Sequence, residues 1–560
     1  MTSYHALSEI FSIGIVFFTG FLLSLLFTPL SSRFAAALNL IDVPNGRSVH
    51  ASSIPKTGGI AIALSFFLTI VLTVKYSGLL PAILVGGIII CLVGFIDDRW
   101  RLSAVQKLFG QIVSVMVFMR IGNISLSGFG DLLAIGEIQF GGFCYFMTLF
   151  GMVGVINAFN LSDGLDGLAS GIGLIASLFL AILAFEYSQW HILLILIALA
   201  GVIFGFLRFN THPAKLFMGD TGSLLIGFVI AAACVELTEC TGIGLSVKPI
   251  TVAYMVSLPI IDTLYVMGNR AIKKMRPFYP DKTHIHHRLM NLGLSHGTTV
   301  IFIYILVVFF CLTGWSFRSH TEFFQFILGI SLMGAFYFTI HCLEKNKFKF
   351  SKLNIDWNTN LLLSQYKILA HKGRSVQIVR PLFICLFFIP LIILAPAPKI
   401  IGLGALAAAF LFGMLFPWNG GKQSIPVANG IMFIGVFLIL IFYHFNPGSP
   451  PWMDVYLNCI SVFGFCWVTM RMLFKRYHGI LFPSGFELLL IGFSWFIPVV
   501  IGQILELSHE NRIKLMWVCL QAIPIIALVK MCIFTQGRQY NSMALWVFMS
   551  FLIVGVTAFL

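Results

Sequence analysis

The sequence predicts an all-α, polytopic integral membrane protein, and three observations support this prediction. Of the 560 residues, 59% are hydrophobic and only 10% are charged, whereas soluble domains carry about 25% charged residues. Apolar runs of about 18 residues, long enough to cross a bilayer as helices, recur along the whole chain. The excess of 35 Lys and Arg over 21 Asp and Glu is typical of loops that face anionic lipid, and no arginine-rich arm or zinc motif indicates nucleic-acid binding.

The apolar runs predict eleven transmembrane helices in residues 1–341. The first run has no Lys or Arg before Arg33 and is too long for a signal peptide, so we expect it to be a transmembrane helix. The expected helices cover residues 10–30, 57–74, 79–96, 104–120, 139–157, 167–185, 190–208, 221–237, 250–269, 298–316 and 322–341. We expect a basic linker at 342–380 and about seven further transmembrane helices in 381–560.

Lys and Arg are distributed unequally over the two sets of alternating loops. One set carries 22 of them, in residues 31–56, 97–107, 208–220, 270–297 and 342–380. The other set carries four, namely Lys75, Arg120, Lys248 and Arg318. The positive-inside rule places the first set in the cytoplasm and the N-terminus outside. The loops rich in carboxylates and histidines all belong to the cytoplasmic set, which indicates an active-site face.

Asp97 and Asp98 form an acidic pair at the end of the third expected helix. Two adjacent carboxylates can hold Mg²⁺, or one can act as a base while the other orients the metal. An acidic pair at this depth is costly, which favours a functional role. The alternative interpretation is a solvated loop in which the pair faces Arg99 and Arg101.

Residues 157–169 combine amides, carboxylates and glycines in a short segment, with Asn157, Asn160, Asp163 and Asp166 as candidate ligand contacts. The spacing of the two Asp residues would place them on one face of an opening helical turn. Glycines between them permit close backbone approach, and a helix N-terminus favours phosphate. A plain helix cap explains one Asp but not the whole set.

Asp220 is the only acid in the segment 208–220, at the start of the eighth expected helix, which suits a metal ligand. Phe217 could stack on a nucleobase, and Asn210 could contact a base edge or ribose. Interfacial packing is the alternative for Phe217. The last motif, with His284, His286 and His287, lacks the cysteines of common zinc sites. We interpret it as hydrogen bonding to phosphate and sugar, with a surface histidine run as the alternative.

Five segments in this order resemble one family, the polyprenyl-phosphate N-acetylhexosamine-1-phosphate transferases of glycosyltransferase family 4. They are PNGRSVH with IPKTGG, GFIDD, NAFNLSDGLDGLASG, FMGDTGS and HIHHRL, and they lie within residues 1–341. The form His-Ile-His-His is similar to the branch that initiates O-antigen and common-antigen synthesis. Arg101 stands where many members carry a third acid, and residues 342–560 match no part of the family.

The resemblance implies transfer of N-acetylhexosamine-1-phosphate from a UDP-sugar to polyprenyl (undecaprenyl) phosphate. It implies Mg²⁺, with Mn²⁺ as an alternative, on Asp220, and a base at Asp97 beside Asp98. It assigns Asn157, Asn160, Asp163 and Asp166 to the nucleotide-sugar, Asn210 and Phe217 to uridine, and His284, His286 and His287 to the pyrophosphate and sugar. The expected location is the bacterial inner membrane, with a cytoplasmic site in contact with lipid and with downstream glycosyltransferases as partners.

Two other functions agree with parts of the sequence. The first is a phospho-muramyl-pentapeptide transferase, whose motif has three consecutive histidines instead of His-Ile-His-His. The second is a membrane transporter or flippase, which also places charged groups in interrupted helices. Transporters usually place their site near the bilayer midplane, whereas the polar motifs here lie in loops, and the chain shows no inverted repeat. We therefore expect a transferase.

Overall fold

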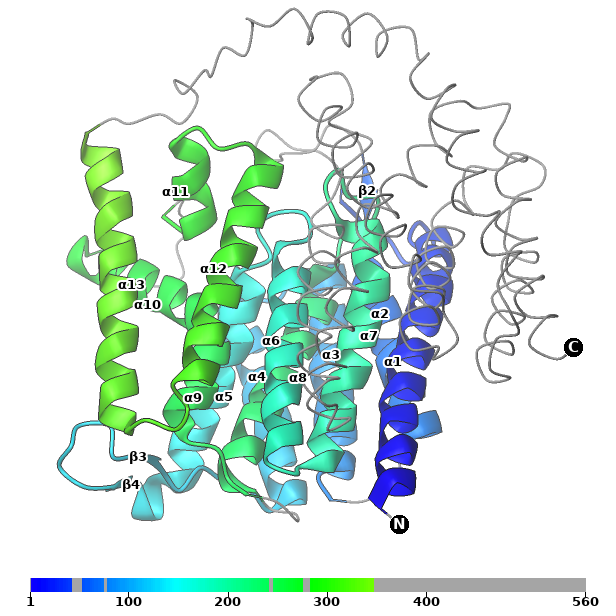
Figure 1. Cartoon of the computed structure of the whole chain (residues 1–560). Helices are drawn as coiled ribbons and strands as arrows, with labels where there is room; N and C mark the ends of the chain where they lie inside the picture. Colours follow the sequence, from blue (N-terminus) through cyan, green and yellow to red (C-terminus); the bar gives the residue numbers. More distant parts are fainter. Residues whose placement is uncertain (1, 43–52, 75–77, 241–244, 275–282, 347–560) are drawn as a thin grey trace, which may run out of the picture. The chain divides into compact units, whose positions relative to one another are not determined.

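The computed structural model describes residues 2–42, 53–74, 78–240, 245–274 and 283–346. These residues form an α-helical bundle (Figure 1). The helices are α1 (Thr2–Arg33), α2 (Gly58–Thr73), α3 (Leu80–Trp100), α4 (Ala104–Gly122), α5 (Cys144–Leu161), α6 (Leu168–Glu186), α7 (Trp190–Asn210), α8 (Gly219–Glu239), α9 (Pro249–Met255), α10 (Ser257–Ile272), α11 (Ile285–Asn291), α12 (His296–Ser316) and α13 (Glu322–Lys345). The expected linker and C-terminal helices lie outside the described residues, apart from the start of the linker at 342–346.

Two short antiparallel β-ribbons interrupt the helical pattern. Strand β1 (Ile41–Asp42) pairs with β2 (Ile54–Pro55), and β3 (Gly128–Gly130) pairs with β4 (Ile138–Gln139). A 3₁₀ turn at Gly141–Phe143 precedes α5, which therefore begins five residues later than expected. The β3–β4 ribbon lies at the end of the bundle near the N-terminus, whereas β2 and α11 lie at the opposite end (Figure 1).

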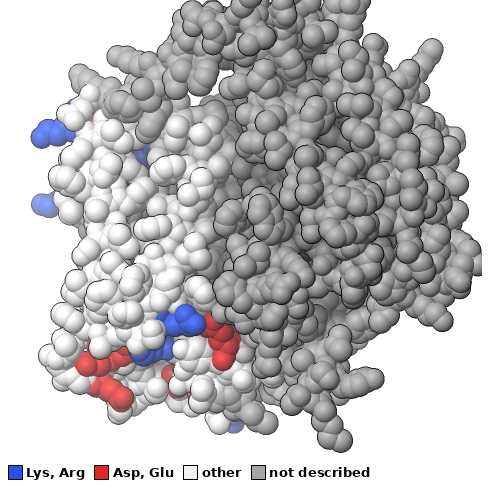
Figure 2. All heavy atoms as spheres, viewed as in Figure 1, with Lys and Arg blue, Asp and Glu red and all other residues white. Residues whose placement is uncertain are grey.

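Nine helices of the described part are long and apolar enough to span a membrane. The innermost are α6 and α8, each with 89% of its apolar stretch buried. The outer helices expose large apolar side chains, such as Leu72 on α2 (64% exposed) and Phe150 on α5 (71% exposed). Much of the described surface in Figure 2 is free of Lys, Arg, Asp and Glu; acidic and basic side chains gather near the lower end, and a few Lys or Arg project at the upper left. An apolar exterior around a packed interior confirms the polytopic membrane fold.

The expected helix at 250–269 is wrong as a single element. The structure has two helices there, α9 and α10, which are bent by 82° at Val256. Pro259 explains the break, because its ring nitrogen has no hydrogen to donate to the carbonyl of Met255 four residues earlier. Proline is tolerated in the first turn of a helix, so α10 can begin at Ser257 in a new direction.

Candidate functional site

The polar motifs meet at the end of the bundle opposite the N-terminus (Figure 1). This follows from the alternation of the helices, since α3, α5 and α7 end there while α4, α6, α8 and α12 begin there. The site is therefore built from loops and helix termini. The segments are 97–107, 157–167, 210–223 and 283–296.

Lys107 lies at the centre of the acidic residues. Its Nζ contacts Asp97 Oδ2 at 2.9 Å and Asp220 Oδ1 at 2.5 Å, and it donates to Asn160 Oδ1 at 3.0 Å. Asn160 Nδ2 also donates to Asp220 Oδ1 at 2.6 Å and to Ser223 Oγ at 2.9 Å. One ammonium group thus joins α3, α4, α5 and α8. Three oxygen atoms converge on a single cation at the mouth of the bundle.

Asp98 caps the N-terminus of α8. Its Oδ1 accepts a hydrogen bond from the backbone N–H of Asp220 at 2.9 Å. Its Oδ2 accepts from the N–H and the hydroxyl of Thr221, at 2.9 and 2.7 Å. Gly219 has a φ of +69°, and a Cβ there would lie 2.7 Å from Asp98 Oδ1, so the cap requires glycine. These contacts give Asp98 a positioning role for Asp220.

Asp163 carries the most perturbed carboxyl group outside the membrane-spanning helices. Burial raises the pKa of Asp163 to about 7, and repulsion from the carboxylates of Asp220, Asp98 and Asp166 adds to the rise. Lys56 opposes the shift. No hydrogen-bond donor to the Asp163 side chain is found in the described part of the chain. Ionisation of Asp163 is therefore disfavoured in this site unless a cation lies beside it.

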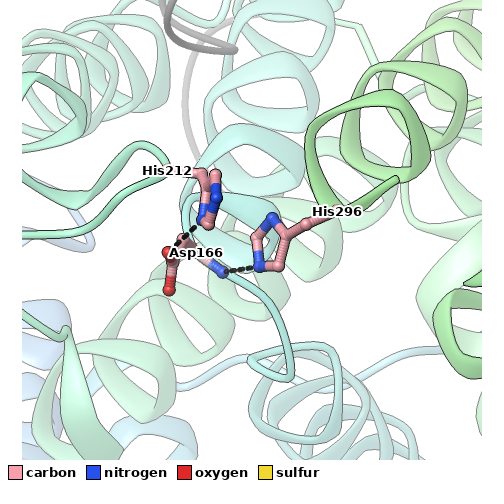
Figure 3. A group of neighbouring side chains, drawn as sticks. All are labelled: Asp166, His212 and His296. Carbon is pink, nitrogen blue, oxygen red and sulfur yellow. Dashed lines mark hydrogen bonds and ion pairs between the residues drawn. The ribbon is translucent and has the colours of Figure 1, made fainter. Parts of the chain in front are cut away.

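The expected helical turn around Asp163 and Asp166 is wrong, because α6 begins only at Leu168, with Gly167 at φ +78° as its N-cap. Asp166 instead contacts a different set of groups (Figure 3). Its Oδ2 lies 2.7 Å from His212 Nδ1 and accepts a hydrogen bond from the N–H of Ala214 at 3.1 Å. Its backbone N–H donates to His296 Nε2 at 3.3 Å. Asp163 thus interacts with the carboxylates of Asp220 and Asp98, whereas Asp166 contacts His212 and His296.

Asn210 is buried and all its side-chain contacts are internal. Its Oδ1 accepts from the N–H of Gly167 and the hydroxyl of Ser170, at 3.1 and 2.9 Å, and its Nδ2 donates to the carbonyl of Leu216 at 3.0 Å. This network supports a role in holding the 211–218 loop against α6. Phe217 is half-buried in that loop, where its N–H donates to the carbonyl of Pro55 at 2.8 Å.

The histidine motif opens the short helix α11. His284 Nδ1 lies 2.8 Å from Asp262 Oδ2, and the N–H of Ile285 donates to Asp262 Oδ1 at 2.9 Å. Tyr337 of α13 donates to the same Oδ1 at 3.2 Å. His284 is therefore a support for α11 within the described structure. Asp262 lies on α10, so the bent helix pair is what brings this carboxylate to the motif.

His286 connects α11 to the Asp163 loop. A Cβ on Gly164 would lie 2.5 Å from His286 Nε2, so glycine is needed for this contact. Burial lowers the pKa of His286 to about 3, with additional repulsion from His287 and His284, so the ring is neutral at physiological pH. A neutral imidazole can donate or accept a hydrogen bond to a sugar without adding charge. His287 is half-buried beside it, with ring centroids 4.2 Å apart.

Asn157 lies one turn deeper than Asn160 and pairs with Gln111. Asn157 Nδ2 donates to Gln111 Oε1 at 2.7 Å, and Gln111 Nε2 donates to Asn157 Oδ1 at 3.2 Å. Gln111 is fully buried, one turn after Lys107 on α4. The amide pair fixes the facing sides of α4 and α5, which sets the positions of Lys107 and Asn160.

Several residues of the site are not apparent from the sequence motifs: Lys107, Gln111, Asp262, His212 and His296. Lys107 was counted as a cytoplasmic loop charge, although it lies in α4. A Lys, a Gln and an Asp within expected apolar helices were available signals, because ionisable and amide groups are costly there without partners. His212 and His296 had no such signal, since each stands alone near a loop.

Comparisons with known proteins agree with this arrangement. The sequence pattern of glycosyl transferase family 4 matches residues 80–238, from α3 to α8. The chain is 35% identical to a probable undecaprenyl-phosphate N-acetylglucosaminyl 1-phosphate transferase of Bacillus subtilis, over 55% of this chain and 86% of the relative. It is 34% identical to a decaprenyl-phosphate N-acetylglucosaminephosphotransferase of Mycobacterium leprae, over 53% and 81%. It is 31% identical to an undecaprenyl-phosphate alpha-N-acetylglucosaminyl 1-phosphate transferase of Salmonella typhi, over 53% and 80%.

At least 80% of the length of each of these relatives aligns with about half of this chain. The segment that matches the family pattern, residues 80–238, includes Asp97, Asp98, Lys107, Asn160 and Asp220. The residues that contact Lys107 thus all lie within the matched region, whereas the histidine motif and Asp262 follow it in the chain. The chain therefore belongs to glycosyl transferase family 4, together with the polyprenyl-phosphate N-acetylglucosamine-1-phosphate transferases.

Proposed function

We propose that the protein transfers N-acetylhexosamine-1-phosphate from a UDP-sugar to polyprenyl phosphate, releasing UMP. The names of its relatives support the sugar phosphate and the lipid acceptor. The observation that carries the proposal is the convergence of Asp97, Asn160 and Asp220 on Lys107 at one end of a membrane bundle. A site at a helix end is open to a water-soluble donor, while the acceptor tail stays in the bilayer.

The residues present fit a Mg²⁺ ion. Burial first, and then the neighbouring carboxylates, raise the pKa of Asp163, and a bound cation would lower it again. The oxygens around Lys107 already converge on a positive group. In the described residues Asp97, Asp163 and Asp220 do not form a closed three-carboxylate cage. Mg²⁺ usually binds one or two carboxylates and completes its shell with waters and substrate phosphates. Asp220 would hold it, and Asp163, whose carboxyl group is repelled by that of Asp220, would gain from the same positive charge.

When bound, Mg²⁺ neutralises the diphosphate and stabilises the leaving UMP. In the proposed reaction an oxygen of the lipid phosphate bonds to the β-phosphorus of the UDP-sugar, and the bond from that phosphorus to the UMP oxygen breaks. Lys107 supplies a fixed positive charge beside the transferred phosphate. Asp98 keeps Asp220 in place through the start of α8.

Proton removal is a small part of this reaction. A phosphate monoester loses its second proton near pH ~6, so most of the lipid phosphate is a dianion at neutral pH. Asp97 accepts a hydrogen bond from the N–H of Leu102 at 2.8 Å and pairs with Lys107. We propose that it takes up the remaining proton or orients the lipid phosphate through Lys107. Asp163 is the alternative acceptor, because its pKa of about 7 lies nearest to neutral pH.

We propose a location in a bacterial inner membrane, with the site in the cytoplasm. The positive-inside rule supports this orientation, because the loops on the side of the site carry most of the Lys and Arg. The N-terminus, at the other end of the bundle in Figure 1, then lies outside. A UDP-sugar made in the cytosol has direct access to this face.

The bent pair α9 and α10 is the one observation that favours a transporter, since transporters form sites at interrupted helices. The carboxylate of this pair is Asp262. Its two oxygens are occupied by His284, the N–H of Ile285 and Tyr337. Through these contacts Asp262 holds the start of α11 in place, so we assign the bent pair a structural role and not a role in substrate transport.

A direct assay tests the proposal. Purified full-length protein is incubated with undecaprenyl phosphate, Mg²⁺ and labelled UDP-N-acetylglucosamine, UDP-N-acetylgalactosamine or UDP-N-acetylmuramoyl-pentapeptide. We expect UMP and a lipid-linked diphospho-sugar in equal amounts with at least one N-acetylhexosamine, and no product with Asp220→Asn at millimolar Mg²⁺. Product from the muramoyl donor alone would place the protein in the other branch. No lipid product with any donor would refute the transferase.

A further inference from the structure

Three side chains from distant segments meet beside the acidic cluster (Figure 3). Asp166 lies in the loop before α6, His212 in the loop after α7, and His296 is the first residue of α12. One ligand atom from each lies within 4.8 Å of the others, and in the described part of the chain no other three His, Cys, Asp or Glu residues meet in this way.

His296 presents a lone pair to this cluster. Its Nε2 accepts the backbone N–H of Asp166 at 3.3 Å, so the ring proton must be on Nδ1. That Nδ1 is buried and has no hydrogen-bond partner among the described residues. The buried nitrogen therefore keeps the proton, and Nε2 is the ligand atom, which an ion would take over from the long bond to the Asp166 N–H.

His212 completes the cluster from the solvent side. Its ring stacks on that of His296, with centroids 4.1 Å apart and an angle of 23° between the planes. Its Nδ1 lies 2.7 Å from Asp166 Oδ2. The His212 side chain is 47% exposed, against 18% for Asp166, so an ion can enter on this side and the His212 ring has room to turn.

Two imidazoles and one carboxylate are the ligand set of many Zn²⁺ sites that keep a position open. Zn²⁺ binds imidazole nitrogen and carboxylate oxygen at about 2.0–2.2 Å, which separates neighbouring tetrahedral ligands by roughly 3.3 Å. The present separations, from 2.7 Å up to 4.8 Å, lie on both sides of that value. Hard Mg²⁺ prefers oxygen ligands and would favour the neighbouring carboxylates instead.

We infer that Asp166, His212 and His296 form a binding site for a divalent transition-metal ion of the Zn²⁺ type, separate from the Asp220 cluster. Ligation through His212 Nδ1 requires the tautomer with its proton on Nε2, which the exposed ring reaches by proton exchange with solvent and without net proton release. The metal also replaces the weak bond from the Asp166 N–H to His296. The ion then links the 162–167 loop, the 211–218 loop and α12.

Occupation of this site should inhibit the transferase, a consequence that rests on the proposed function. Asp166 Oδ2 also accepts the N–H of Ala214, three residues before Phe217, so the metal would fix the loop that carries the proposed nucleobase contact. Mg²⁺ should not relieve the inhibition, because it competes poorly for imidazole nitrogen. A chelator that prefers Zn²⁺ should relieve it.

Metal binding can be measured without any substrate. Full-length protein carrying no histidine tag is stripped with a chelator and titrated with Co²⁺, whose visible absorption reports nitrogen ligation, and then with Zn²⁺ against a coloured chelator. We expect one bound ion per chain at this site. His212→Gln and His296→Gln should each weaken binding at least about tenfold, while His341→Gln, an exposed histidine of α13, should not.

Circular dichroism identifies any variant that has lost its helices. Because two histidines are replaced separately, the test still holds if one of the two variants fails to fold. Unchanged Zn²⁺ affinity in whichever variants remain folded would overturn the inference, as would binding that only His341→Gln removes. If both variants unfold, Asp166→Asn takes their place with the same criterion. Lipid product with Mg²⁺ but no Zn²⁺ binding would overturn this inference alone, whereas Zn²⁺ binding without lipid product would overturn the transferase alone.

Discussion

Lys107 is the residue whose replacement tests the candidate site most directly. Its ammonium group joins Asp97 and Asp220 and contacts Asn160, and its side chain is only 16% exposed. Lys107→Met keeps the length and helix propensity of the side chain and removes its charge. The two carboxylates would then lose their shared counter-ion while their other hydrogen bonds remain.

The expected loss of stability follows from the burial of these pairs. Exposed ion pairs contribute about 0–1 kcal/mol, whereas removing one partner of a buried pair costs about 3–5 kcal/mol. The Asp97 side chain is 11% exposed and that of Asp220 is 33% exposed. We therefore expect the free energy of unfolding to fall by about 3 kcal/mol, at the low end of the buried range.

The measurement is unfolding of the purified full-length protein in detergent, by heat and by sodium dodecyl sulfate, without Mg²⁺ and with a chelator present. Lys107→Arg keeps the charge and should lose less stability than Lys107→Met. Adding Mg²⁺ should stabilise Lys107→Met more than the wild type, because two unpaired carboxylates are then free to bind it. A Lys107→Met protein within about 0.5 kcal/mol of the wild type, with no larger gain from Mg²⁺, would refute the reasoning.

Four further predictions concern the same region. Asp220→Asn should lose turnover and regain part of it at high Mg²⁺, whereas Asp97→Asn should not respond; equal recovery would make Asp97 a second metal ligand. Phe217→Ala should weaken UDP-sugar binding roughly ten- to hundredfold in calorimetry, since base stacking contributes about 1–3 kcal/mol; unchanged affinity would place the uracil elsewhere. Asp163 has a folded pKa of about 7, above its ordinary 3.8, so its stabilising contribution is present below pH 4 and lost as the pH rises to 7. Wild type should therefore lose at most about 4 kcal/mol over that window relative to Asp163→Asn when no divalent cation is present, and parallel pH profiles would contradict this. A truncation after Lys345 should keep transferase activity, and an inactive but inserted and folded product would show that the C-terminal residues belong to the catalytic unit.

The order and direction of most helices could be predicted from the sequence. Apolar runs long enough to cross a bilayer determine where helices form, because backbone groups in lipid must be satisfied within the segment. Ten of the eleven expected helices in residues 1–341 are present, with ends that differ by up to eight residues, the largest difference being the start of α1 at Thr2. The break at Val256 was missed because the run is apolar throughout, although Pro259 carried the signal.

The location of the site could also be predicted, because helices that alternate in direction bring every second loop to the same end. The motifs containing Asp97, Asp163, Asp220 and His286 fall in loops of one set, so they had to share one face. This inference needs only the number of helices between the motifs. It says nothing about which side chains touch.

Those contacts depend on how each helix is rotated about its axis and on how closely two helices pack, and neither follows from local pattern. Lys107 and Asp220 are 113 residues apart, and Asp98 and Thr221 are 123 apart. A carboxylate in a motif can bind a metal or cap a helix, and only the donors around it decide which. Gly219 lets Asp98 reach the start of α8, and the bend at Val256 turns Asp262 toward His284. The sequence by itself thus determined the membrane fold and the face of the site, whereas tertiary packing decided the partners of each charge, because those partners come from helices that meet only in the folded bundle.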